Sequence, residues 1–226
     1  MPKTSHFSRQ KPRKLYLGQN RHTASSLNAA FFPILSVKKM ALSSPKTRRL
    51  FKSIPYSTHV LITSPSAAKL FAKTAISLGY QYFIKKLQYL SIGQTTSKVL
   101  RTYISQSISI KESEHPIAES LASLLPTLSP NSLVLYPSSF LARKILLNTM
   151  ATHSIPHKHC FLYSMLPNKL PKHYLDFYQE FLFTSPSGVR AYVSQHPFIE
   201  KKRYSCIGEI TARELQKYHE NFSLFK

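Results

Sequence analysis

Acidic residues are scarce in this chain of 226 residues, which contains 9 Asp and Glu side chains against 31 Lys and Arg. Asp176 is the sole aspartate, and only Glu112 and Glu114 lie close together in sequence. An enzyme that needs paired carboxylates, such as most glycosidases or two-metal phosphoryl-transfer enzymes, would have few residues to use. We therefore expect any chemistry to depend on hydroxyl groups, backbone amides and cations.

The chain also has few cysteines, no tryptophan and no long apolar run. Cys160 and Cys206 lack the spacing of a metal-binding or redox pair, which is typical of a reduced cytosolic protein rather than a disulfide scaffold. No apolar run approaches the length of a membrane span. Residues 1–13 are a basic tail without the apolar core of a secretory signal. These features predict a cytoplasmic protein without a membrane partner.

Positive charge and aromatic side chains are abundant. The formal net charge is +22, and 14 Phe and 13 Tyr residues supply material for a buried core. Such a charge attracts anions, so it leaves nucleic acid, an anionic membrane and a small polyanion as candidate partners. The basic residues occur as dispersed pairs, and no RNA-binding motif is present. We therefore expect no specific nucleic-acid partner, only nonspecific binding that salt weakens.

Two motifs occur twice in the same order. Residues 59–73 (HVLITSPSAAKLFAK) and 180–193 (EFLFTSPSGVRAYV) each contain an apolar strand, Thr-Ser-Pro-Ser and a helical pattern. Residues 88–103 (QYLSIGQTTSKVLRTY) and 203–218 (RYSCIGEITARELQKY) each contain a short strand, Ile-Gly-x-x-Thr and an amphipathic helix. This repetition predicts two structurally related halves. The alternation of strands and helices predicts an α/β fold whose mostly parallel sheets are flanked by helices.

Loss of periodicity marks two connecting segments, at about 36–48 and 164–172, where Ser, Lys and Pro gather. The sequence therefore predicts one α/β domain over 43–163. A second domain would be discontinuous and consist of 1–42 together with 166–226.

Further elements are predicted from local patterns. Strands at 15–18 and 31–37 would complete the sheet of the discontinuous domain. A helix at 117–125 would begin after Pro116, and another would place Leu141, Ile145 and Met150 on one face. Residues 159–165 are predicted as a strand.

Polar turns follow several predicted strands and precede predicted helices, namely TSPSA, TSPSG, IGQTT, IGEIT and PSS. In open parallel sheets, ligands bind beyond the carboxyl ends of the strands. The free N–H groups of a helix N-terminus favour carboxylate or phosphate there. A single Ser or Thr before a helix is more often only its N-cap. Several such turns in two ordered copies favour a small ligand that carries many anionic groups.

The order and spacing of these motifs resemble uroporphyrinogen-III synthases over roughly residues 14–218. FFPILSVKKM resembles the strand that enters that family's first linker, and Tyr163 ends a strand before the second linker. The resemblance implies two HemD-like, Rossmann-like domains joined by a two-stranded linker, with the active-site cleft between them. It implies a lyase of haem biosynthesis that cyclises hydroxymethylbilane to uroporphyrinogen III, with loss of water and inversion of ring D.

The resemblance also implies roles for individual residues. Tyr163 matches a tyrosine thought to assist departure of the substrate hydroxyl, which is a general-acid role. The residues expected to hold substrate carboxylates, largely through backbone amides, are Ser64, Ser66, Gly93, Thr96, Ser138, Ser139, Ser185, Ser187, Gly188, Gly208 and Thr211. No metal and no organic cofactor is implied. We expect a monomer that receives its substrate from hydroxymethylbilane synthase.

Other interpretations of the sequence remain open. The strand-end turns are also compatible with a sugar-phosphate or other anion-binding α/β module, and the charge with a basic RNA-binding protein. His153, His157, His159 and Cys160 form a group that zinc favours, but no second set of ligands with matching spacing accompanies them. A polar loop entering a strand is the better interpretation of that group.

Overall fold

The computed structural model describes residues 13–225, which form two compact units. One unit contains the residues up to Ser36 together with those from Leu166 onward, and the other is Val37–Met165. The first unit is therefore discontinuous in sequence. The predicted basic tail lies outside the described residues, apart from Arg13.

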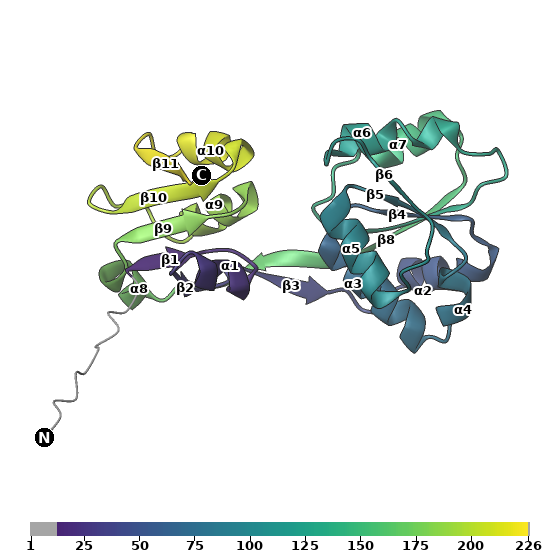
Figure 1. The fold of residues 1–226 in the computed structure, drawn as a ribbon, viewed down its shortest axis with the longest axis horizontal. Coiled ribbons are helices and arrows are strands. Elements are labelled where there is room, and N and C mark those ends of the chain that lie inside the picture. Colours follow the sequence, from purple (N-terminus) through teal and green to yellow (C-terminus); the bar gives the residue numbers. More distant parts are fainter. Residues whose placement is uncertain (1–12, 226) are drawn as a thin grey trace, which may run out of the picture. The chain divides into compact units, whose positions relative to one another are not determined.

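The discontinuous unit contains a five-stranded sheet in the order β11-β10-β9-β1-β2, in which each neighbouring pair is parallel. Helices connect the strands (Figure 1). Its elements are β1 (Lys14–Tyr16), α1 (Arg21–Ser26), β2 (Ala30–Phe31), α8 (Lys172–Phe177), β9 (Glu180–Phe183), α9 (Pro186–Val193), β10 (Arg203–Ile207), α10 (Glu209–Gln216) and β11 (Phe222–Phe225).

The second unit contains a six-stranded sheet in the order β3-β8-β7-β4-β5-β6, in which β4 to β8 run parallel. Its elements are β3 (Leu35–Lys39), α2 (Pro45–Lys52), the 3-10 turn η1 (Ile54–Tyr56), β4 (His59–Ile62), α3 (Pro65–Ser77), α4 (Gln81–Ile84), β5 (Gln88–Ser91), α5 (Gln94–Tyr103), β6 (Ile110–Glu112), α6 (Ala118–Ala122), the 3-10 turn η2 (Leu125–Thr127), β7 (Val134–Ser139), α7 (Ile145–Thr152) and β8 (His157–Pro167). Both sheets confirm the predicted α/β class with mainly parallel strands.

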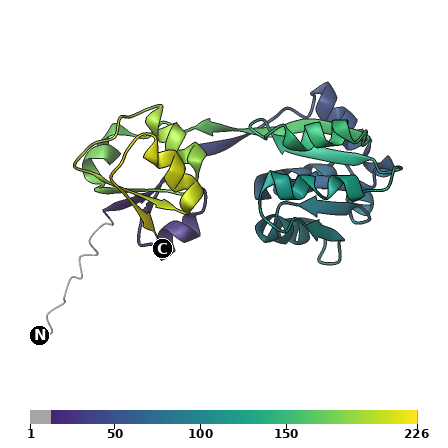
Figure 2. The ribbon, with the colours of Figure 1, turned by 90° about the horizontal axis from the view of Figure 1, so that it is seen from above.

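The sheet of the second unit is covered by helices on both faces. Figure 1 shows α6 and α7 on one side and α2 to α5 on the other, and Figure 2 views the unit from the side of α6 and α7. Side chains alternate accordingly along β4, since Val60 and Ile62 join one core cluster and Leu61 joins the other. Successive side chains of a strand point to opposite faces, so a strand buried on both faces is continuously apolar.

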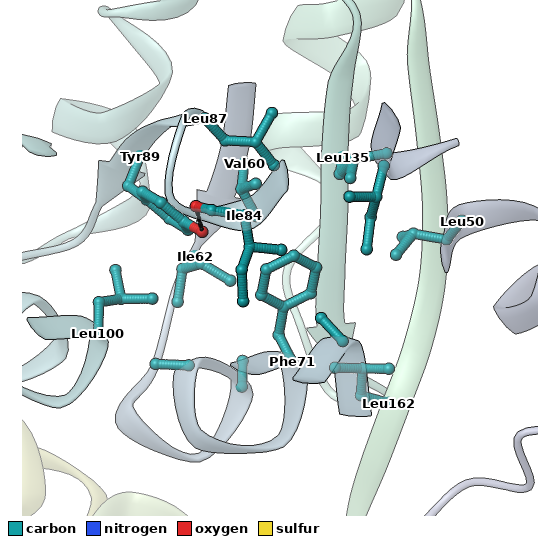
Figure 3. Close-up of a cluster of buried hydrophobic side chains, with 14 of the residues drawn as sticks. Leu50, Val60, Ile62, Phe71, Ile84, Leu87, Tyr89, Leu100, Leu135 and Leu162 are labelled. Atoms are coloured by element: carbon teal, nitrogen blue, oxygen red, sulfur yellow. Dashed lines mark hydrogen bonds between the residues drawn. The ribbon is translucent and has the colours of Figure 1, made fainter. Parts of the chain in front are cut away.

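Phe71 of α3 lies inside the larger of these clusters. Figure 3 shows its ring among Ile62, Ile84 and Leu162, and the ring centroid of Phe51 lies 5.8 Å away. Phe71 is fully buried. This core holds α3 against the sheet and thereby fixes the turn that joins β4 to α3.

The predicted strand over 31–37 is wrong, because two strands in different sheets occupy this region. β2 ends at Phe31 in the first unit, whereas β3 begins at Leu35 and lies beside β8. Pro33 separates them, and proline cannot donate a ladder hydrogen bond. The predicted linker over 36–48 consequently contains most of β3 and the start of α2.

Two predicted helices are shorter than expected. The helix containing Leu141 begins only at Ile145, and Leu141 is 61% exposed in the loop before it. The predicted helix over 117–125 is the short α6, after which a 3-10 turn contains Pro126. Proline lacks the N–H that would continue a helix, which explains the interruption.

Candidate active site

A pocket of about 300 Å³ opens at the carboxyl ends of β4, β5 and β7 in the second unit. This is the edge at which parallel α/β sheets bind ligands. Its polar lining consists of Thr63, Ser64, Tyr136, Ser139, Arg143 and Tyr163. The apolar lining includes Ile92, Pro116 and Leu146, so the pocket combines an apolar body with a few convergent polar groups.

Tyr163 and Ser64 meet in this pocket although they lie 99 residues apart in sequence. The Tyr163 Oη and Ser64 Oγ atoms are 2.8 Å apart, within hydrogen-bonding distance. Ser64 Oγ also accepts a 3.1 Å hydrogen bond from the Ala67 amide. That bond occupies a lone pair of Ser64, whose own hydrogen is then free to point at Tyr163 Oη. In this arrangement the Tyr163 hydrogen is free for a ligand.

The backbone around Tyr163 is held in place by its neighbour strand. The register of β7 against β8 shifts between Ser138 and Ser139, so Ser139 pairs with Tyr163. The Phe140 amide then donates a 2.8 Å hydrogen bond to the Tyr163 carbonyl. An irregularity of this kind re-aims side chains near functional sites. Here it leaves Ser139 lining the pocket while Ser138 is fully buried.

Tyr136 is a second tyrosine of the pocket, and it is almost fully buried. Burial raises its pKa, an effect that hydrogen bonds with Thr63 and Ser138 partly oppose. The phenol of Tyr136 is therefore protonated at neutral pH and can act only as a neutral hydrogen-bonding group. No feature of its sequence environment distinguished it from other strand tyrosines.

The two Thr-Ser-Pro-Ser turns adopt nearly the same conformation. Ser64 has φ −165° and ψ 154°, and Ser185 has φ −158° and ψ 151°. Each serine caps its helix, since Ser185 Oγ accepts a 3.2 Å hydrogen bond from Gly188 just as Ser64 does from Ala67. Capping is therefore a structural role of both serines. The two turns differ in the second contact of the capping serine. Ser185 Oγ lies 3.2 Å from Ser187 Oγ, whereas Ser64 Oγ lies beside the Tyr163 hydroxyl.

The two Ile-Gly-x-x-Thr turns leave their first helical amides without a side-chain cap. Gly93 has φ +133° and Gly208 has φ +82°, conformations that side-chain-bearing residues rarely adopt. An uncapped helix N-terminus retains free N–H groups that favour an anion. The amides of these turns, rather than their threonine side chains, are the groups available to a ligand.

Several predicted site residues are buried. Thr96 and Thr211 are almost fully buried. Ser138 Oγ lies 2.9 Å from His159 Nε2 and 3.2 Å from the Ser139 carbonyl oxygen. The structure thus brings together Ser64, Ser139 and Tyr163 in one pocket. It places Ser66 in the first turn of α3, and Gly93 and Thr96 around a neighbouring hollow.

That neighbouring hollow, of about 460 Å³, also contains Glu112 and Glu114. The expectation of chemistry without carboxylates does not hold there, since two of the three acidic side chains of this unit line it. The strand β6 ends at Glu112 beside β5 and so carries these residues to the same edge. The pocket at Tyr163, in contrast, has Arg143 as its charged lining residue.

Arg143 is the functional candidate that the sequence did not reveal. It follows the PSS turn by four residues and lines the pocket beside Tyr163. Its guanidinium forms an ion pair with Glu119 of α6. The side chains of Arg143 and Glu119 are 61% and 48% exposed, so this pair is weak and can exchange for another carboxylate. The one feature of the sequence that could have pointed to Arg143 was its position shortly after a strand-end turn.

The His and Cys residues around β8 do not form a metal centre. Among residues 13–225, no three His, Cys, Asp or Glu side chains gather as a metal site would require. Burial raises the pKa of the Cys160 thiol to about 11, so the thiol stays protonated at neutral pH. His159 instead packs against Phe161, with ring centroids 4.8 Å apart, and bonds to Ser138.

His159 is expected to make stability depend on pH. Burial, assisted by the positive charge of His157 and Lys46, lowers the pKa of His159 from 6.5 to about 4. The unfolded chain therefore binds this proton at a higher pH than the folded chain does. Neutral His159 therefore contributes fully to the free energy of unfolding above pH 6.5, and this contribution is lost as the pH falls toward 4. Thermal melts of H159Q should depend less on pH over this window than those of the parent protein.

The exposed His153 provides the matched control for this test. H153Q should retain the pH dependence of the parent protein between pH 6.5 and 4. His59, whose pKa burial also lowers, contributes to the dependence that remains in H159Q. Equal pH dependence of H159Q and the parent protein would contradict the assignment.

Comparison with known proteins gives a family match and matches of the fold. The profile of the family described as "Uroporphyrinogen-III synthase HemD" matches residues 20–221. The uroporphyrinogen-III synthetase structure from Helicobacter pylori superposes with a TM-score of 0.68 at 16% identity, covering 94% of this chain and 92% of that chain. A mutant uroporphyrinogen III synthase from the extremely thermophilic bacterium Thermus thermophilus gives a TM-score of 0.65 at 15% identity, with the same coverage. No protein with a curated description matched.

At these identities the superpositions establish the shared fold, whereas the family profile spans most of the sequence. The chain therefore belongs to the uroporphyrinogen-III synthase HemD family.

Proposed function

We propose that this protein is a uroporphyrinogen-III synthase, which cyclises hydroxymethylbilane to uroporphyrinogen III with loss of water and inversion of ring D. The observation that carries the proposal is the Tyr163 hydroxyl, which lies in a pocket at the carboxyl edge of a parallel sheet and within 2.8 Å of Ser64 Oγ. Family membership supports it independently.

Tyr163 acts as the general acid in this proposal. Its proton goes to the hydroxyl of the substrate's hydroxymethyl group while the bond between that carbon and oxygen breaks, so the oxygen leaves as water. The electron pair of the Tyr163 O–H bond stays on the phenolic oxygen, where Ser64 donates a hydrogen bond to the developing negative charge. A donor aimed at charge that develops during the reaction lowers the barrier.

Cations and amides hold the carboxylates of the substrate in this proposal. Arg143 provides a positive charge in the pocket that Tyr163 lines, and the turn at Gly93 provides uncapped amides in the same unit. A pocket of about 300 Å³ is at the lower end of small-molecule sites and suits one end of a linear tetrapyrrole. Positioning then matters because the product isomer depends on which atoms are brought together for ring closure.

A coupled assay tests the proposal. Hydroxymethylbilane is generated in place in the presence of the protein, the products are oxidised, and the porphyrin isomers are separated. Isomer III well above the uncatalysed background supports the proposal. Isomer I alone from folded protein overturns it. In that case, thermal shifts with sugar phosphates and RNA would test the anion-binding alternatives.

Arg143 is expected to contribute mainly to substrate binding. R143A should raise KM by roughly tenfold or more, because a hydrogen bond to a charged group contributes about 1.5–3 kcal/mol. The effect on kcat should be smaller, since the guanidinium holds a carboxylate that does not react. Steady-state measurement of the coupled reaction separates the two constants.

Lys144 supplies the matched control, because it is an exposed cation adjacent in sequence that does not line the pocket. K144A removes the same charge and should leave KM close to that of the parent protein. E119A should not raise KM, since it removes the carboxylate that competes for Arg143. Equal KM changes in R143A and K144A would show that the overall positive potential of the protein, and not a contact of Arg143, determines KM.

A further inference from the structure

Exposed apolar side chains gather at one corner of the second unit. We call this corner surface the α3–α4 corner and define it by Tyr56, Ile76, Leu78, Tyr82 and Phe83, all of which are exposed. Tyr56 is 80% exposed and Tyr82 is 61% exposed. Exposed apolar groups that cluster mark an interaction surface, whereas single ones carry no such meaning.

These five residues come from adjacent elements. The helix α4 contacts both the end of α3 and the turn η1. The Gly79 amide donates a 3.0 Å hydrogen bond to the Ile76 carbonyl, and the rings of Tyr82 and Phe83 pack edge to face at 5.7 Å. The turn η1 also contacts α2, the helix that precedes it. The exposed side chains of the corner are therefore carried by elements that contact one another.

The corner has a rigid base. Ile54 of η1 and Ile84 of α4 are buried in the same core cluster as Phe71. Figure 3 shows Ile84 directed at the ring of Phe71. Because the inward residues of η1 and α4 are anchored in this way, their exposed neighbours stay presented on the surface.

The charged side chains within the segment that builds the corner are all cations. Lys52, Lys85 and Lys86 are exposed there, and Lys86 Nζ lies 4.0 Å from the centre of the Tyr82 ring. The first acidic residue of the sequence is Glu112, so residues 45–86 contain no carboxylate side chain. A partner that offers both anionic and apolar groups would therefore complement this corner.

We propose that the α3–α4 corner is a peripheral docking surface for an anionic lipid bilayer. Aliphatic and aromatic side chains flanked by lysines are the pattern by which proteins lie on such membranes. Tyrosine is enriched at the membrane interface, and each nearby Lys adds attraction to anionic headgroups. RNA would stack on Tyr56 and Tyr82, but it would leave Ile76 and Leu78 without a partner.

This inference goes beyond the proposed catalytic function and does not depend on it. It revises the sequence-based expectation of no membrane partner, which rested on the lack of a spanning segment. Throughout the described residues, no helix has both the length and the apolar character that crossing a membrane demands. A protein that lies on the bilayer surface needs neither.

Vesicle co-sedimentation of the full chain tests the proposal. We expect the protein to pellet with vesicles of phosphatidylcholine mixed with phosphatidylserine at about 0.1 M salt, and much less with phosphatidylcholine alone. The variant carrying Y56S, L78S and Y82S should bind the mixed vesicles roughly tenfold more weakly. Circular dichroism melts show whether this variant folds.

Charge reversal gives a matched pair of variants. K85E with K86E alters the corner, whereas K38E with K39E makes the same net change at exposed residues of β3. The first variant should lose most of the vesicle binding and the second should retain it. Equal losses in both would overturn the proposal, as would binding of the triple serine variant at the parent level.

A fluorescence measurement keeps the test independent of those variants. The chain contains no tryptophan, so Y56W provides a single probe at the corner. Its emission should shift to shorter wavelength when mixed vesicles are added, while that of Y218W, placed on the other unit, should not. No shift for Y56W would overturn the proposal. So would serine substitutions that weaken binding to single-stranded RNA but not to vesicles.

Discussion

Replacing Tyr163 by phenylalanine is expected to lower the rate of uroporphyrinogen III formation by roughly 100-fold, the lower end of what general-acid catalysis contributes. The substitution removes one oxygen from a side chain that is almost fully buried, so the shape of the pocket changes little. Binding of the substrate should persist, because in the proposed function Arg143 and backbone amides, not this hydroxyl, hold the substrate carboxylates. The fall should therefore appear in kcat rather than in KM.

The geometry explains why this hydroxyl should matter. Tyr163 Oη has Ser64 Oγ at 2.8 Å, and Ser64 is itself fixed by the Ala67 amide. In the proposed reaction, the hydroxyl thus has a partner for the negative charge that develops on it. A preorganised donor of this kind contributes more than one that must reorient during the reaction.

Y89F is the matched control for Y163F. Tyr89 is fully buried in the same unit, and its hydroxyl donates a 2.7 Å hydrogen bond to the Ile84 carbonyl. Loss of that bond should cost about 1 kcal/mol of stability and leave kcat unchanged. If Y163F keeps the parent kcat while folding normally, Tyr163 is not the general acid.

Replacing Phe71 by alanine should destabilise the second unit by about 3–5 kcal/mol, the range found for buried phenylalanine. The loss has two parts, namely the apolar surface that is no longer buried and the cavity left behind. Phe71 lies between the sheet residue Ile62 and the helical residue Ile84, and it packs on Phe51 at 5.8 Å. Because several elements enclose the cavity, it cannot collapse easily. Denaturant unfolding followed by circular dichroism measures the effect.

F140A provides the comparison, because Phe140 belongs to the same unit but is mostly exposed. The same change of side chain there should alter the stability by less than about 1 kcal/mol. A loss for F71A as small as that for F140A would mean that the surrounding side chains refill the space.

Local features of both halves were predictable from the sequence. The Thr-Ser-Pro-Ser turns predicted a capped helix after a strand, and Ser64 and Ser185 cap their helices with nearly equal backbone angles. Gly93 and Gly208 adopt positive φ, a backbone conformation that glycine tolerates and other residues rarely adopt. Capping and backbone freedom depend on residues a few positions apart, so they can be inferred without the rest of the fold.

The errors arose where local patterns competed with long-range pairing. The apolar run around Pro33 was predicted as one strand, but its two parts belong to different sheets. Periodicity suggested that Leu141 begins a helix, yet the helix starts at Ile145. A hydrophobic pattern shows that residues are suited to burial, but it does not show which partner buries them.

The sequence by itself determined the α/β class, the repeated strand–turn–helix units and the type of residue at each strand end, because these depend on neighbouring residues. Only the tertiary structure decided which side chains meet. It joined Ser64 to Tyr163 across 99 positions, and it buried Ser138 while leaving Ser139 in the pocket. It also placed Arg143 beside Tyr163. The physical reason is that strand order and register, which bring distant residues together, are set by packing of the whole sheet.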